Sequence, residues 1–305
     1  MIVTPGIYQM TAAEYHADPC DTPSLSSSIA NILLTDSPRH AWFAHPKLNP
    51  NYKQRESATF DLGTAAHAYM LEGADVITVI DAEDWRTKAA KDARDAARAE
   101  GKVPLLARQS LAVIEMAAAA QDQLVVFNDP PIPFTGGQPE QTLIWQEGGV
   151  WCRTRLDYLH DDHRWIDDLK STGGSANPDA WTRGQLFTTG HDLQAAFYLR
   201  GLAALTGKQA RFRFVVIENE APYALSVISL TPAALAFAEK KVQAAITLWR
   251  FCMDENRWPG YPTRTCHAEL PPWLEAQWME REYREPVTSV DDGRSLADQL
   301  FGEHK

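Results

Sequence analysis

Three side chains with catalytic potential lie in two neighbouring segments, 150–159 and 163–172, which the sequence predicts as a β-hairpin. Asp157 lies on the first strand, and Asp168 and Lys170 lie on the second. Because side chains on a strand alternate between its two faces, the hairpin can direct all three at one spot. Neighbouring carboxylates suit Mg²⁺. A lysine beside them can orient an attacking water or stabilise charge that develops on a phosphate.

The same hairpin also fits a plainer interpretation, a solvated turn with a cross-strand pair of aspartate and lysine, since the pattern D-x-K is common. The flanking Ile166 and Leu169 instead indicate a buried strand. Two adjacent acids, Asp167 and Asp168, are costly to bury unless something binds them. The hairpin is therefore predicted to hold a metal ion rather than to face water.

Two expected helices add polar side chains that could join this site. On the helix expected over 191–206, Gln194 and Tyr198 are four residues apart and share one face, with His191 one turn earlier. Alone, this spacing also fits an ordinary amphipathic helix. The helix expected over 58–72 carries His67 in its middle. This imidazole is either a core residue bonded to a backbone carbonyl or a metal ligand, well suited to Mn²⁺ and tolerable for Mg²⁺.

Together, these motifs resemble the PD-(D/E)XK nuclease superfamily in its RecB-like branch. The resemblance rests on Asp157, on the run Asp168-Leu169-Lys170 and on the pair Gln194 and Tyr198. Three N-terminal segments are similar to the serine-rich entry, the helix end and the histidine helix of that branch: 25–28, 36–40 and 63–67. From residue 23 to residue 198 the chain most resembles the nuclease domain of RecE-type exonucleases (exodeoxyribonuclease VIII) of phage or prophage origin.

The resemblance implies an α/β fold, a PD-(D/E)XK nuclease core with a mixed central sheet flanked by helices, which also fits the expected order of elements. It implies a site for Mg²⁺, with Mn²⁺ as an alternative, whose ligands are the side chains of His67, Asp157 and Asp168 and the backbone carbonyl of Leu169. Lys170 is then the catalytic lysine. Gln194 and Tyr198 are expected to hold the DNA backbone, or that lysine, in place.

Further residues near the hairpin are candidates for contacts with substrate. Arg153 and Arg155 share the Asp157 face, where they could bind phosphates, including a 5′-terminal one, or could equally pair with nearby carboxylates. Thr172 follows the lysine at a position where the family often has Ser or Thr. Glu140 begins an expected strand over 140–147, and it is a candidate for a role with the metal or its water.

The activity implied by the resemblance is 5′→3′ exonuclease digestion of linear double-stranded DNA, which leaves a 3′ single strand. The implied partners are DNA with a free end, a single-strand annealing protein and further copies of the chain in a ring-like oligomer. A structure-specific or repair endonuclease on the same fold is the main alternative. A non-catalytic DNA-binding protein on an inactive nuclease fold, and a small-molecule enzyme with an unrelated metal site, are the others.

Composition limits these readings. The net charge of −11 argues mildly against a general DNA-binding protein, so any basic surface must be local. The segment 86–98 is the most basic, and it is either a solvated helix face with acidic partners or a wall that contacts the DNA backbone. The four cysteines form no C-x-x-C pair, which disfavours zinc and iron–sulfur sites. No membrane span or signal peptide is expected, so the predicted location is cytoplasmic.

The expected organisation is one nuclease domain over 1–258 and an irregular tail over 259–305 with a short final helix after 291. Within the domain, a pair of helices over 82–127, hinged at 101–104, is expected as an insertion. The residues from 171 to 177 are expected as a flexible loop. The other main elements expected are helices over 26–34, 39–45, 179–187 and 233–258 and strands over 76–80, 211–218 and 223–230.

Overall fold

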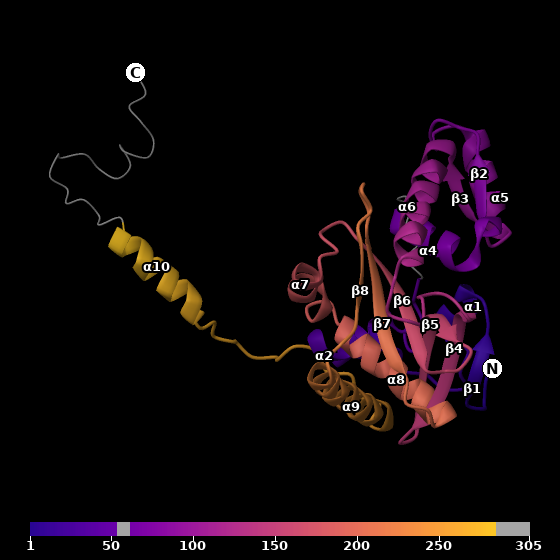
Figure 1. Cartoon of the computed structure of the whole chain (residues 1–305). Coiled ribbons are helices and arrows are strands. Elements are labelled where there is room, and N and C mark those ends of the chain that lie inside the picture. The colour runs from indigo at the N-terminus through magenta and orange to yellow at the C-terminus, as the bar shows by residue number, and fades with distance from the viewer. Residues whose placement is uncertain (54–61, 285–305) are drawn as a thin grey trace. The chain divides into compact units, whose positions relative to one another are not determined.

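The computed structural model describes residues 1–53 and 62–284 (Figure 1). Its helices are α1 (Ala12–His16), α2 (Ser27–Thr35), α3 (Pro38–Ala44), α4 (Leu62–Glu72), α5 (Lys88–Ala99), α6 (Ala107–Val125), α7 (Pro178–Trp181), α8 (His191–Thr206), α9 (Pro232–Asp254) and α10 (Pro272–Arg284). Its strands are β1 (Gly6–Gln9), β2 (Ile77–Ile80), β3 (Val103–Leu106), β4 (Gly137–Glu147), β5 (Val150–His160), β6 (Trp165–Thr172), β7 (Arg211–Glu218) and β8 (Leu225–Ile228).

A six-stranded mixed sheet forms the centre of the fold, in the order β1-β4-β5-β6-β7-β8. All neighbouring pairs are antiparallel except β6 and β7, which run parallel along eight residue pairs from Trp165↔Arg211 to Thr172↔Glu218. A parallel pair needs a long crossover, which α7 and α8 supply here. The predicted fold class, a mixed sheet flanked by helices, is confirmed.

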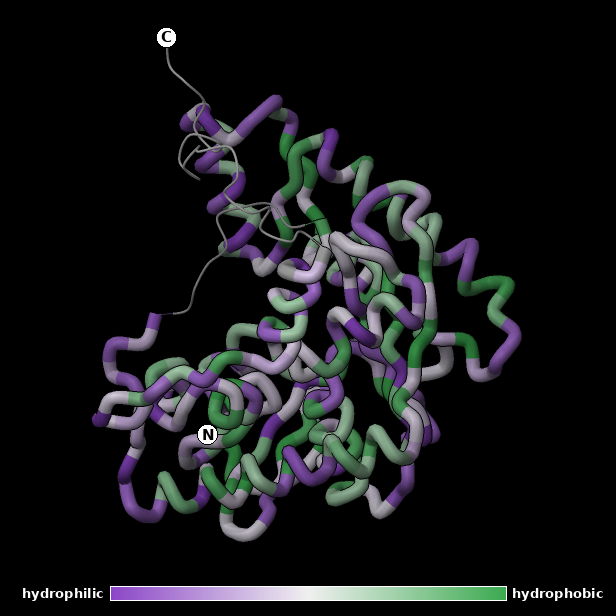
Figure 2. Tube along the Cα trace, turned by 90° about the vertical axis from the view of Figure 1, so that its left-hand side faces the viewer, coloured by the Kyte–Doolittle hydropathy of each residue, from purple (hydrophilic) through white to green (hydrophobic). Residues whose placement is uncertain are grey.

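Helices cover both faces of this sheet, and the alternation along β7 shows it. Phe212, Phe214 and Val216 belong to the main core, which they share with α2, α8 and α9. Val215 and Ile217 point the other way, into a second core shared with α4, α6 and β3. Figure 2 shows hydrophobic and hydrophilic stretches interleaved along the trace. A strand buried on both faces typically has a continuous run of apolar residues. The second half of β7, whose sequence is RFRFVVIE, has such a run.

Side-chain caps fix where several helices begin. The Ser26 hydroxyl accepts the Ile29 N–H at the start of α2, and Thr231 caps α9 with Pro232 in the first helical position. Thr11 and Glu14 form a reciprocal capping box on α1. These caps were readable from the sequence, so the expected starts of these helices lie within two residues of the observed ones.

The segment expected as two hinged helices contains a strand instead. Val103–Leu106 forms β3, which pairs in parallel with β2, and α5 makes the crossover between them. Leu105 of β3 and Met116 of α6 are buried in the core that also contains Ala65 and Ala66 of α4. The expected hinge at 101–104 is therefore wrong, because burying Leu105 and Leu106 against α6 is worth more than leaving them in a solvated turn.

The structure also differs from expectation after β6. Thr172 is the last residue of β6 rather than part of a flexible loop. The expected helix 179–187 divides into α7 and a π-helical turn over Thr182–Leu186. π-Helical turns are rare and are frequent at functional sites.

Arg153 has a structural role that differs from the expected contact with phosphate. It is buried, it lies 3.2 Å from Asp18, and its Nη1 donates to the carbonyl and the hydroxyl of Ser24. His45 closes the same cluster, with its Nε2 3.2 Å from Asp18 Oδ2. Arg153 thus pairs with a nearby carboxylate, the alternative left open by the sequence, and it joins the N-terminal segment to β5.

The chain divides into two compact units, Met1–Gly260 and Tyr261–Lys305. In the second unit, the structure contains the helix α10, where an irregular tail was expected. Its large apolar side chains are exposed, among them Trp273, Trp278 and Tyr283. The short helix expected after 291 lies outside the described residues. Among the described helices, none has the length and apolarity needed to cross a bilayer.

Replacing Asp18 with Asn is expected to lower the free energy of unfolding at pH 7 by about 3 kcal/mol, because the buried Arg153 guanidinium loses its counter-charge. Burial opposes ionisation of Asp18, but the hydrogen bond from His45 and the charge of Arg153 hold its pKa well below the ordinary value. This stabilisation is therefore complete above the unfolded-state pKa of about 4 and declines as the pH falls further. Urea unfolding of wild type and variant at pH 7 and pH 3 measures both effects.

The matched control is Asp21→Asn, because Asp21 is exposed and lies in the same segment. It should change the free energy of unfolding by less than about 0.5 kcal/mol. A cost for Asp18→Asn no larger than for the control, or a difference from wild type that widens in acid, would contradict the assignment.

Candidate active site

The candidate active site lies where β5 and β6 separate. These strands pair only at Tyr158↔Asp167 and Leu159↔Ile166. Beyond this point the Leu169 N–H donates to a side chain, the Asp157 carboxylate, at 2.8 Å. The carboxylate thus takes the place of a backbone acceptor, and β6 continues alone beside β7. Asp157 and Asp168 come to lie on the two borders of the resulting gap.

The regular alternation assumed for β5 is broken beside this gap. Leu156 and Leu159 are three residues apart, yet both belong to the main core. Opposite them, Glu140 of β4 has a left-handed backbone (φ 58°), which is uncommon for a residue other than glycine. Pro139↔Tyr158 and Gln141↔Leu156 are paired, while Glu140 is left out of the ladder. Such outliers store strain, and they cluster at active sites.

His67 of α4 meets Asp157 at the gap. Its Nε2 lies 3.0 Å from Asp157 Oδ2, and its Nδ1 lies 3.8 Å from Glu140 Oε1. Glu140 in turn pairs with Arg155 at 2.5 Å. Arg155 therefore also has a carboxylate partner, although one-fifth of its side chain stays exposed. The helix and two strands thus bring together His67, Asp157 and Glu140.

Asp168 is fully buried on the other border of the gap, where α8 approaches. Gln194 Nε2 donates to its Oδ1 at 2.7 Å. Its Oδ2 pairs with the Lys170 ammonium. The ammonium also lies 5.9 Å from the centre of the Phe214 ring. Gln194 was expected to hold DNA or the lysine, and the structure shows it holding the carboxylate instead.

Two acids of the site have raised pKa values, while for Asp157 burial is outweighed by the charge of His67 and the pKa is lowered. Burial, and then the charge of Asp157, raise the pKa of Asp168 above its ordinary value. Burial likewise raises the pKa of Glu140 to about 7, despite the Arg155 charge. For Lys170, burial favours loss of the proton, but the charge of Asp168 outweighs it and raises the pKa. Lys170 is therefore a cation at neutral pH.

These residues fit a divalent cation by their chemistry. Imidazole and carboxylate oxygens are ligands that Mg²⁺ and Mn²⁺ accept, and a positive ion would offset the excess of buried acid. Within residues 1–53 and 62–284, no group of three or more His, Cys, Asp and Glu side chains is already arranged around a point. His67 Nε2 and Asp157 Oδ2, two candidate ligand atoms, lie 3.0 Å apart.

An open cleft of about 340 Å³ adjoins the site. Its lining residues come from α4, α6, β6 and β7: Gly63, Thr64, Ala66, His67, Met116, Leu169, Lys170, Ser171 and Ile217. Both His67 and Lys170 can therefore be reached from solvent, which a substrate requires.

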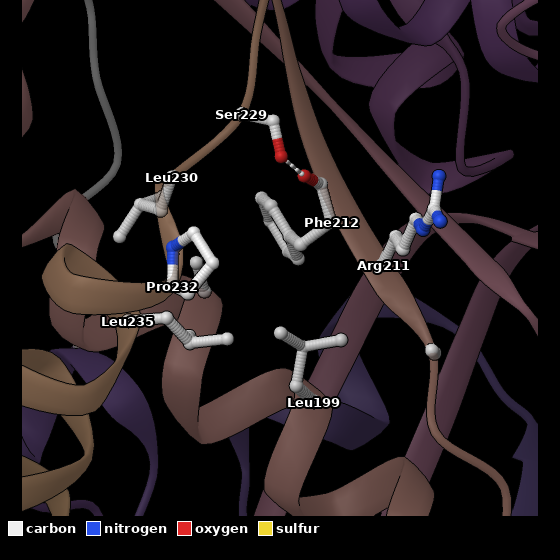
Figure 3. Close-up of a pocket in the computed structure, with 9 residues that line it drawn as sticks. Leu199, Arg211, Phe212, Ser229, Leu230, Pro232 and Leu235 are labelled. Carbon is white, nitrogen blue, oxygen red and sulfur yellow. Dashed lines mark hydrogen bonds between the residues drawn. The ribbon is translucent and has the colours of Figure 1, made fainter.

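A second pocket, of about 410 Å³, lies at the opposite end of β7 and is not a catalytic candidate (Figure 3). Leu199, Leu230 and Leu235 line it, and the Ser229 hydroxyl donates to the Phe212 carbonyl at 2.7 Å. Among the described lining residues Arg211 is the one charged group, and no acid accompanies it. Size alone thus does not locate the site, whereas the convergence of titratable groups does.

The family is established by comparison. The family described as PDDEXK-like domain of unknown function (DUF3799) matches residues 32–269, most of the chain. The chain belongs to this family. All of the site residues of this PDDEXK-like domain, from His67 to Tyr198, fall within the match. Nucleases of the PDDEXK type generally use divalent metals, in agreement with the donor set at the gap.

Solved structures show the same fold. The crystal structure of a "Putative exonuclease" from Eubacterium rectale is 13% identical, has a TM-score of 0.57, and the match covers 92% of this chain and 99% of that one. The structure of SSO0001, at 12% identity, covers 84% of this chain and 100% of that one, but its TM-score of 0.28 is too low to carry an argument. No curated protein sequence matches this chain.

Two other predicted residues are placed away from the cleft. Tyr198 is buried and packs edge-on against Phe212, with ring centres 6.0 Å apart. It therefore supports the core beneath the site rather than lying free to reach DNA. The buried Thr172 accepts the Gly174 N–H at 3.1 Å and shapes the turn after β6. Its contact with substrate stays a prediction.

Asp167 shows what sequence reasoning missed. This buried acid does not need a metal, because Arg213 donates to its Oδ1 at 2.8 Å and His160 lies 2.6 Å from its Oδ2. The Arg213 guanidinium also stacks on Trp165 at 4.4 Å. Asp168 of the adjacent pair instead has Gln194 and Lys170, both at the site. Arg213 on the neighbouring strand β7 was the sequence signal that Asp167 has a basic partner. The pairing of β6 with β7, which brings the two residues together, could not be predicted from the sequence.

A divalent cation is expected to stabilise the PDDEXK-like domain against heat. Mn²⁺ or Mg²⁺ at 100 times its Kd should add about 2.7 kcal/mol to the free energy of unfolding, because the folded state alone assembles the ligands. Asp157→Asn and His67→Ala should each remove most of this gain. Differential scanning fluorimetry with and without the metal measures it.

Asp161→Asn serves as the control for this measurement, since Asp161 is exposed in the turn between β5 and β6. Its metal-dependent shift in Tm should equal that of wild type. If all variants keep the full shift, the ion binds elsewhere and the assignment of the gap is wrong.

Proposed function

We propose that this protein is a Mg²⁺-dependent deoxyribonuclease, and that it acts as a 5′→3′ exonuclease on linear double-stranded DNA. The observation that supports hydrolysis is the gap between β5 and β6, where Asp157 pairs with His67 and Asp168 pairs with Lys170. Both His67 and Lys170 line one accessible cleft. Membership of a PDDEXK-like family supports the same chemistry. Mn²⁺ is the alternative ion.

His67, Asp157, Asp168 and the carbonyl of Leu169 are the groups proposed to hold the ion. When bound, the ion would lower the pKa of a water molecule and polarise the scissile phosphate. The chain itself sets the positions of these ligands. The Leu169 N–H fixes Asp157, and the Gln194 amide fixes Asp168.

Lys170 is proposed to act as a cation rather than as a base. Its raised pKa keeps the ammonium protonated at neutral pH, so it donates hydrogen bonds and does not take up a proton. A fixed positive charge beside the reacting phosphate stabilises the negative charge that develops in the transition state. The same ammonium can orient the attacking water.

The exonuclease form of the proposal rests on likeness. The sequence resembles RecE-type enzymes, and the E. rectale protein of similar fold is named a "Putative exonuclease". A 3′ single strand as the product would suit an annealing protein as partner, and a ring of several copies would keep the enzyme on its DNA. Arg155 and Thr172 are proposed to contact phosphates. An endonuclease on the same fold is the alternative, because its site would have the same residues.

The test is digestion of a linear duplex labelled at either the 5′ or the 3′ end, beside a closed circular duplex, with Mg²⁺ or with EDTA. Loss from the 5′ end of linear DNA alone, dependent on Mg²⁺, is expected. Lys170→Ala should lower the rate by about 10²–10³-fold, the cost of removing one preorganised donor to the transition state. Lys240→Ala, at an exposed site on α9, should leave the rate unchanged.

Each alternative has its own outcome in this assay. Cutting of the circle would identify an endonuclease, and loss from the 3′ end would reverse the proposed polarity. Binding of DNA without cutting would identify an inactive nuclease fold. Cutting that survives in both EDTA and Lys170→Ala would show that the gap is not the active site.

A further inference from the structure

We propose that His191 is a positioning residue, which fixes the orientation of the Gln194 carboxamide and, through it, the Asp168 carboxylate. This inference rests on the proposed function, since Asp168 is there a ligand of the catalytic ion. It assigns to His191 a role in the site that acts through Gln194.

The carboxamide of Gln194 must face one way for the site to form. Its Nε2 donates to Asp168 Oδ1 at 2.7 Å. If the amide were reversed, its carbonyl oxygen would lie against the carboxylate oxygen, and two acceptors would meet. A donor to the amide oxygen would hold the carboxamide in this same orientation.

His191 occupies the position of such a donor. It begins α8, one turn before Gln194, and its side chain forms a hydrogen bond with Gln194. The amide oxygen of Gln194, which the bond to Asp168 leaves free, accepts from the imidazole N–H in this arrangement. A carboxylate, an amide and an imidazole thus form one chain of hydrogen bonds.

Aromatic rings hold the imidazole in place. Trp181 stacks on it with ring centres 5.5 Å apart and planes inclined by 8°, and Phe214 lies 5.7 Å away on another side. Both of these rings are buried and they contact each other at 5.3 Å. Trp181 ends α7 directly before the π-helical turn Thr182–Leu186. This turn therefore lies next to the residue that stacks on His191.

The charges around His191 favour the same arrangement. Burial, and then the charge of Lys170, lower the pKa of His191 to about 4. The ring is thus neutral near pH 7, with one N–H to donate. Phe214 also lies against the Lys170 ammonium. One aromatic cluster therefore supports both neighbours of Asp168, the amide on one side and the ammonium on the other.

Three substitutions separate the N–H from the ring. His191→Phe keeps an aromatic ring for stacking but removes the N–H. His191→Asn and His191→Gln keep an N–H near the positions of Nδ1 and Nε2 but remove the ring. If His191 acts through Gln194, the His191→Phe variant should have a kcat on DNA about 10-fold lower than wild type, with KM changed less than 2-fold. Either His191→Asn or His191→Gln should then restore at least half of the lost rate. A Phe variant with the rate of wild type would show that the ring alone matters and would overturn the proposal.

A double-mutant cycle with Gln194→Ala tests the path of the effect. If His191 acts only through Gln194, His191→Phe should have little further effect once Gln194 is Ala. An undiminished effect in that background would overturn the proposal. Thermal melts of each variant show whether the fold is retained.

Binding of Mn²⁺ alone, followed by isothermal titration calorimetry, gives a readout that does not need nuclease activity. Loss of a residue that orients a metal ligand typically weakens metal binding by about 10- to 100-fold. His191→Phe should weaken Mn²⁺ binding within this range, but not in the Gln194→Ala background. If wild type binds Mn²⁺ but cuts no DNA, the nuclease proposal fails, while the calorimetric cycle still decides the role of His191. Equal Mn²⁺ affinity of wild type and His191→Phe would overturn it.

Discussion

The hydrogen bond from the Leu169 N–H to the Asp157 carboxylate is the interaction on which the site depends. A backbone N–H within a sheet must find an acceptor, and here a side chain supplies it in place of the neighbouring strand. β5 and β6 can therefore separate without leaving a buried donor unpaired. The separation opens the cleft, and the bond that permits it also fixes one proposed metal ligand. The same hydrogen bond thus shapes the cleft and positions a residue proposed to take part in the reaction.

Three clusters of buried charge show how differently the fold treats its acids. Asp18 has Arg153, His45 and Ser24, and Asp167 has Arg213 and His160. In both, the acid has enough donors and cations to be stable as an anion. The site at the gap instead collects Asp157, Asp168 and Glu140 around His67, Arg155 and Lys170, one basic group for each acid rather than two. Two of these acids have raised pKa values. An unbalanced cluster is costly to the apoprotein, and it distinguishes a binding site from a structural ion pair.

Much of the fold could be predicted from local signals. The helix 191–206 was expected with its observed bounds, because its apolar pattern is regular and Gly190 and Gly207 flank it in left-handed conformations. β3 was missed because four residues carry little periodicity, and its parallel pairing with β2 is a tertiary effect. α10 was missed because its apolar side chains face no core. Short or unpacked elements lack the pattern on which such predictions depend.

The candidate site was predictable in its residues but less so in their partners. The spacing of Asp168 and Lys170 placed them together, and they form an ion pair. Arg153 was placed on a plausible face, yet its partner Asp18 is far away in sequence and nothing local indicated it. Tyr198 has the expected helical spacing, but packing against Phe212 decides its environment. Alternation gives the face of a side chain, whereas burial and long-range pairing give its role.

The parallel pairing of β6 with β7 has a consequence for folding. The site joins residues from α4, β5, β6 and α8, and β6 is held in place by a strand that follows it only after α7 and α8. Contacts between distant parts of a chain form late, because the entropy of closing long loops must be overcome first. The reactive groups therefore come together only when nearly the whole first unit has folded. A growing or truncated chain would hold the same side chains without assembling them, so the capacity for hydrolysis would arise together with the complete fold.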